Sequence, residues 1–156
     1  MQFKTVILVL HVLSGTLGSS AALWAMVDLK NIENGSAKRV SNACMAEFVL
    51  TLLSLLAGGL YYVLFYQDEK QIILNGPSPI AHTFFMEVKE HVFFILLLLS
   101  LYLFVITRHL HAAIDVQKIR LIKITLMAIF TLGFLMIGFG EFIDAGVKSG
   151  MSKFNN

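Results

Sequence analysis

The chain has 156 residues, of which 57% are hydrophobic and 14% are charged, and its formal net charge is +2. Its mean hydropathy of +0.78 is far above that of a soluble domain of this size, so the composition predicts an integral membrane protein that contacts the lipid bilayer. No basic cluster indicates nucleic-acid binding. The single cysteine, Cys44, excludes an internal disulfide and any site with several thiolates.

Four apolar segments follow one another along the chain, at about residues 3–27, 43–66, 80–110 and 121–146. Each is near or above the ~20 residues that cross ~30 Å of hydrocarbon as a helix. The first apolar run is too long for the core of a cleaved signal peptide. Only short loops and a polar tail remain, so we expect a single transmembrane domain over 1–156. The expected fold is an all-α, integral membrane four-helix bundle with up-down-up-down topology.

The arginines indicate the orientation of this bundle. Arg39, Arg108 and Arg120 all lie in or beside the first and third loops. Cationic side chains near helix ends are retained on the cytoplasmic side of a membrane. The sequence therefore predicts that both termini lie outside, on the periplasmic side if the protein belongs to the inner membrane of a bacterium.

Two histidines, His11 and His91, lie inside the first and third apolar segments. At ~1.5 Å of rise per residue, both imidazoles lie roughly 10–15 Å below the outer surface. An imidazole in hydrocarbon is costly unless it faces the bundle interior and has a partner, so it marks a candidate functional site. Two of them at one depth predict a shared ligand.

Other residues reach the same depth. Steps of three or four residues from His11 give Gly15 and Gly18, a stripe of small side chains that permits close approach of a helix or a flat ligand. The same steps from His91 reach Phe94 in an apolar and aromatic wall. Such a layer suits haem, because two imidazoles can take the axial positions of its iron while glycines make room for the macrocycle. The predicted cofactor site comprises His11, His91, Gly15, Gly18, Gly58, Gly59, Phe94 and Tyr62.

The chain lacks a Cys-x-x-Cys-His motif, so the predicted cofactor is non-covalently bound haem b. Iron with two axial imidazoles has no open position, which favours electron transfer, with a membrane quinol as one possible redox partner. Two alternatives stay open. One is a non-haem metal held by His11, His91, Glu87 and Glu141. The other is a cofactor-free accessory subunit that packs its Gly15 and Gly18 face against a larger membrane complex.

The remaining intramembrane charges have plainer interpretations. Glu47 comes near the start of the second apolar segment, which is typical of a charge at a helix end. Glu87, Lys89 and Glu90 lie close to the membrane surface, where long charged side chains reach outward to the polar interface. We expect these three residues to form a collar that positions the third helix.

The stretch Leu10-His11-Val12-Leu13-Ser14-Gly15 is similar to the first helix of the HemJ-type protoporphyrinogen oxidases and of the CopD-like membrane domains. Lys89, followed by a long aliphatic run to Arg108-His109, is similar to their third helix. This resemblance covers nearly the whole chain and implies a four-helix fold with haem b near His11. The family's third helix usually has a histidine two residues before the lysine, where this chain has Glu87, so the resemblance does not extend to oxidase activity.

Overall fold

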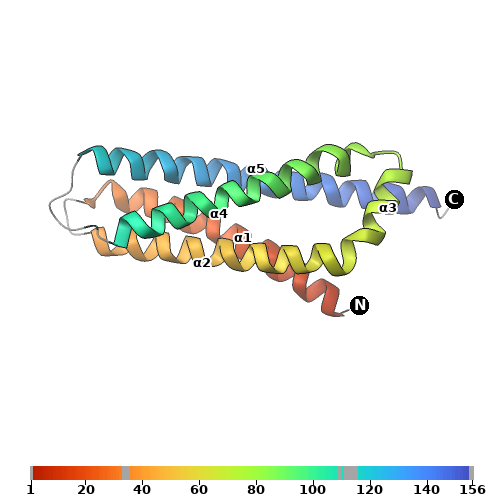
Figure 1. Cartoon of the computed structure of the whole chain (residues 1–156), viewed down its shortest axis with the longest axis horizontal. Helices are drawn as coiled ribbons and strands as arrows, with labels where there is room; N and C mark the ends of the chain where they lie inside the picture. The colour runs from red at the N-terminus through yellow and green to blue at the C-terminus, as the bar shows by residue number, and fades with distance from the viewer. Residues whose placement is uncertain (1, 33–35, 109, 111–115, 155–156) are drawn as a thin grey trace.

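The computed structural model describes residues 2–32, 36–108, 110 and 116–154 (Figure 1). All regular elements of these residues are helical. They are α1 (Gln2–Leu29), α2 (Ala37–Tyr61), the π-helical segment η2 (Tyr62–Tyr66), α3 (Gln67–Asn75), the π-helical segment η3 (Ala81–Met86), α4 (Glu87–Arg108) and α5 (Val116–Phe154).

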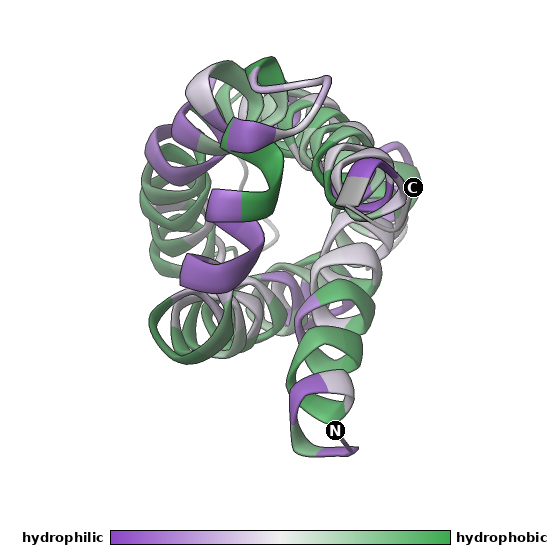
Figure 2. Ribbon diagram, turned by 90° about the vertical axis from the view of Figure 1, so that its right-hand side faces the viewer, coloured by the Kyte–Doolittle hydropathy of each residue, from purple (hydrophilic) through white to green (hydrophobic). Residues whose placement is uncertain are grey.

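Four continuous helical stretches are long and apolar enough to cross a membrane: Gln2–Leu29, Ala37–Asn75, Ala81–Arg108 and Val116–Lys153. They alternate in direction and pack as a ring in which α1 contacts α2 and α5, while α4 contacts α2 and α5 (Figures 1 and 2). The expected all-α, up-down-up-down bundle is confirmed. Large apolar side chains cover its outside, including Leu98 at 66% and Phe134 at 68% exposed. This surface suits lipid, and the protein is an integral membrane protein.

Two helices are longer than the hydropathy pattern predicts. The second begins at Ala37 rather than near residue 43, and α5 continues to Phe154 rather than ending near residue 146. Polar residues such as Lys38 and Arg39 extend a helix past the apolar segment, because intrachain hydrogen bonds do not depend on hydropathy. As a result, Glu47 lies ten residues into its helix, or ~15 Å from its start.

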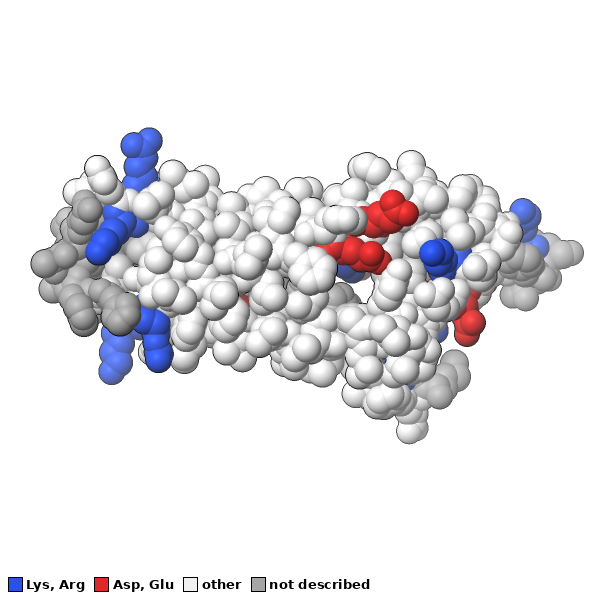
Figure 3. Space-filling model, viewed as in Figure 1, with Lys and Arg blue, Asp and Glu red and all other residues white. Residues whose placement is uncertain are grey.

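The two ends of the bundle differ. We call the end where α1 finishes and α2 begins the basic end, and the end with both termini the capped end. At the capped end, α3 and η3 pack on α5, and the buried apolar cluster there comprises Tyr66 of η2, Ile73, Ala81, Ile143 and Val147. Figure 3 shows basic side chains at the basic end, whereas both acidic and basic side chains gather around a hollow toward the capped end.

Small residues bring α1 close to α2. A Cβ atom added to Gly18 would lie 3.3 Å from Thr51 Oγ1 and 3.5 Å from the Cβ of Leu50, and one added to Gly15 would lie 3.1 Å from Ser54 Oγ. Close backbone approach of this kind is how membrane helices gain packing contacts without a hydrophobic driving force. Gly15 and Gly18, which the sequence predicts as cofactor or partner contacts, both lie inside the bundle, between α1 and α2.

Candidate functional site

The most buried charged side chain of the described residues is Glu47, in the middle of the bundle. It is 0% exposed. Its Oε1 accepts hydrogen bonds from Thr51 Oγ1 at 2.9 Å and from Ser100 Oγ of α4 at 2.7 Å. Its Oε2 has no hydrogen-bond partner within the described residues. Glu47 thus joins α2 to α4 and keeps one free carboxyl oxygen.

This placement corrects the interpretation of Glu47 as a helix-end charge. The sequence did contain a usable signal, because Thr51 and Ser54 follow Glu47 at steps of four and three residues in an otherwise apolar helix. Such a polar stripe marks one face of a membrane helix as protein-facing. The error came from the helix start, which hydropathy alone put six residues too late.

About two helical turns toward the capped end, His11 of α1 packs against α2. Its Nδ1 lies 2.8 Å from the carbonyl oxygen of Ser54, and Ser54 Oγ donates to the carbonyl oxygen of His11 at 2.9 Å. The imidazole lies directly on Gly58, where an added Cβ would come within 2.7 Å of Nδ1. A carbonyl oxygen can only accept, so in the neutral ring Nδ1 carries the proton and Nε2 keeps its lone pair.

Helix α4 contributes two side chains to the same layer. The ring of Phe93 lies 6.1 Å from the His11 ring, centroid to centroid. Lys89, one turn further along, reaches across to α5, where its Nζ lies 3.4 Å from the position of a Cβ on Gly140. The expectation that Lys89 turns outward to the membrane surface is thus corrected. The layer takes groups from all four spanning helices.

His91 does not belong to this layer. Two helical residues turn the side chain by ~200°, so His91 lies on the opposite side of α4 from Lys89 and Phe93. It is exposed, and its Nδ1 lies 2.6 Å from the carbonyl oxygen of Glu87. The structure therefore does not bring His11 and His91 together, and the predicted pair of axial ligands is not formed within one chain.

The other predicted site residues are dispersed. Phe94 is 61% exposed, on the outward side of α4. Gly59 is exposed and an added Cβ would meet nothing within 4 Å, whereas Tyr62 stacks on Tyr66 with ring centroids 5.1 Å apart. Glu87 and Glu141 are exposed as well. Within the described residues, no group of three or more His, Cys, Asp or Glu side chains is placed to hold a metal ion. The mixed metal site of His11, His91, Glu87 and Glu141 is not formed.

Polar contacts also occur near both ends of the bundle, and the sequence did not predict them. At the basic end, Asp28 accepts from Trp24 Nε1 at 2.9 Å and from Arg39 Nε at 3.2 Å. At the capped end, the buried His82 lies with its Nδ1 3.1 Å from the hydroxyl of Tyr66. The core also contains an apolar cluster that includes Val40, Leu103 and Ile122, so the polar groups lie at separate levels of the bundle.

The residues fit haem only in part. Metal-bound histidines commonly donate their second ring nitrogen to a backbone carbonyl, as His11 does with Ser54. The aromatic ring of Phe93 and the cationic Lys89 lie near this imidazole. The donor set therefore suits a group held by one imidazole, and it does not suit iron held by His11 and His91 of the same chain.

Chemically, the interior combines a carboxyl group, an imidazole and an amine, which are the side-chain groups that most often accept and release protons in proteins. These groups lie in a bundle whose outside is apolar. No protein-family model, no curated protein and no solved structure matches this chain.

Proposed function

We propose that this membrane protein carries protons through the interior of its bundle. The observation that supports the proposal most strongly is Glu47, which is fully buried between α2 and α4 with one carboxyl oxygen unpartnered. Ionisable side chains inside membrane helices are costly, and they mark proton relays and ion pathways. A carboxyl group held by two hydroxyl donors at one oxygen is fixed in orientation, so its second oxygen can exchange a proton with a water molecule.

The path runs from Glu47 toward the capped end. Ser54 lies seven residues further along the same helix, ~10 Å away, and it holds His11 in place. Lys89 lies beyond Phe93 on the facing helix. These spacings exceed a direct hydrogen bond, so the proposal requires water molecules between the levels, as in other polar membrane interiors. Glu47 Oε2 and the Nε2 of His11 are the groups that such water would contact.

The test is proton flux into proteoliposomes that contain a trapped pH-sensitive dye and a potassium-valinomycin potential. We expect the wild-type protein to carry protons. Loss of a positioned proton-transfer group typically lowers a rate by ~10²–10⁴-fold, so Glu47→Gln should lower the proton flux by at least about tenfold. Gln keeps the size of the side chain and can still accept from Thr51 and Ser100. The matched control is Glu141→Gln, which removes an exposed carboxylate and should leave the flux unchanged.

Two results would overturn the proposal. One is a wild-type flux no higher than that of empty liposomes. The other is equal flux in wild type and Glu47→Gln when both proteins elute as single species and unfold at similar temperatures.

A second candidate function is binding of haem b with His11 as the one ligand from this chain, in an electron-transfer protein that exchanges electrons with a membrane quinol. The observation that favours it is the orientation of His11, whose Nδ1 donates to the carbonyl oxygen of Ser54, while Nε2 has no hydrogen-bond partner among the described residues. Haem would supply a one-electron redox centre in this layer. The resemblance to HemJ-type and CopD-like proteins supports the same position.

An optical spectrum of protein purified from haem-replete cells tests this candidate. We expect a reduced-minus-oxidised haem b spectrum that His11→Ala abolishes and His91→Ala retains, because His91 faces away from the bundle. Haem-free wild-type protein, or haem that persists at full stoichiometry in His11→Ala, would reject it.

We also propose that the basic end faces the cytoplasm of a bacterial cell and that both termini lie in the periplasm. The position of all three arginines at or beside the basic end supports this orientation.

A further inference from the structure

The outward face of α4 has a regular pattern of exposed side chains. Their spacing alternates between four and three residues, which is the repeat of helices that pair along a left-handed seam. The exposed residues on this outward stripe are Glu87, His91, Phe94, Leu98, Leu101 and Val105. The stripe lies opposite the buried face of α4, which holds Leu96, Ser100 and Leu103.

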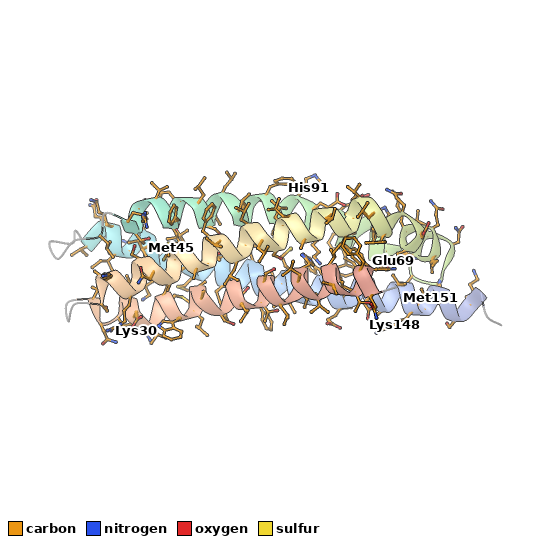
Figure 4. All side chains as sticks on the ribbon, turned by 90° about the horizontal axis from the view of Figure 1, so that it is seen from below. Lys30, Met45, Glu69, His91, Lys148 and Met151 are labelled. Carbon is orange, nitrogen blue, oxygen red and sulfur yellow. The ribbon has the colours of Figure 1, made fainter. Side chains whose placement is uncertain are left out.

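Two members of the outward stripe, Glu87 and His91, are poorly suited to lipid. His91 lies 17 residues from Arg108, or ~25 Å along the helix and so still within the span of a bilayer. Figure 4 shows it on the outside of the bundle. Its Nδ1 is occupied by the carbonyl oxygen of Glu87, which leaves Nε2 as the group that a partner can contact. Ionisable side chains at this depth almost always pair with another group rather than face lipid.

We propose that the outward stripe of α4 pairs with the same stripe of a second copy of this chain. Two copies in one membrane share an orientation, so a two-fold axis along the membrane normal places equal depths of the two stripes side by side. At this seam the imidazole of His91 packs against the side chain of Glu87 from the second copy, one helical turn away. Its Nδ1 donates to a carbonyl oxygen, so a second proton, carried by either Nε2 or the Glu87 carboxyl group, joins the two side chains. The stripe is complementary to itself, because it contains both the imidazole and the carboxylate, and this selects a second copy over an unrelated helix.

Below the polar pair, the apolar members of the stripe supply the packing. Phe94, Leu98 and Val105 are each more than half exposed in one chain, at 61%, 66% and 52%. Side chains at this spacing interdigitate when two helices cross at about +20°. This pairing is independent of the proposed proton path, which lies on the opposite face of α4.

Disulfide cross-linking in native membranes tests the pairing. The background variant is Cys44→Ala, because Cys44 is the only cysteine of the sequence. In this background Leu98→Cys places a thiol in the middle of the stripe, and Phe134→Cys places one on α5 with similar exposure, 68% against 66%. After mild oxidation, we expect a product of twice the chain mass for Leu98→Cys and none above background for Phe134→Cys.

A second variant tests the polar pair. Adding His91→Ala to the Leu98→Cys protein should weaken the dimer by about three- to tenfold, the range given by single interhelical hydrogen bonds in membranes. The change removes an exposed side chain, so the monomer fold should be retained. Three results would overturn the proposal: equal cross-linking at Leu98 and Phe134, a cross-linked product that contains another protein, or a dimer affinity that His91→Ala leaves unchanged.

Discussion

At the scale of single residues, individual hydrogen bonds and one absent side chain set the positions of the polar groups in the interior. Glu47 is oriented by two hydroxyl groups on different helices. His11 is oriented by Ser54 and lies on Gly58, whose lack of a side chain leaves room for the imidazole. Small changes at these positions should therefore have effects out of proportion to their size.

Gly58→Ala is a direct prediction of this geometry. The new methyl group would lie 2.7 Å from Nδ1 of His11, so the ring must move away from Ser54. We expect a loss of ~1–3 kcal/mol in the free energy of unfolding, as for other overpacked sites, measured by denaturation in detergent micelles.

The neighbouring glycine provides the matched control. A Cβ at Gly59 meets nothing within 4 Å, so Gly59→Ala should be neutral or slightly stabilising, by up to ~1 kcal/mol from helix propensity. Equal destabilisation by Gly58→Ala and Gly59→Ala would contradict the placement of His11.

At the scale of the helix, two residues of α4 that are close in sequence face opposite sides of the helix. Lys89 reaches into the bundle toward Gly140, and His91, two residues later, faces outward. One residue turns the helix by ~100°, so a shift of one residue in phase would exchange the two roles. The π-helical segments η2 and η3 flank this region on both sides of the connection. Each inserted residue in a π-helical turn changes the phase of the helix that follows it.

At the scale of the whole molecule, the distribution of charge predicts its orientation. We expect a cysteine at position 152, near the capped end, to react with a membrane-impermeant maleimide in intact bacterial cells, using Ser152→Cys in the Cys44→Ala background. Lys118→Cys, near the basic end, should react only after the cells are lysed. Both positions are exposed. The reverse labelling pattern would contradict the proposed orientation.

Fold class and topology follow from the sequence by itself, because hydropathy is a local property and each apolar segment is long enough to span the bilayer. The depth of His11 and His91 is equally local, since it depends only on counting residues from a helix end. Which way each side chain points is not local. The tertiary structure alone placed His11 against Gly58 and turned His91 outward, because the neighbouring helices set the rotation of each helix about its axis. The same packing, with the earlier start of α2, brought Glu47 to the centre of the bundle.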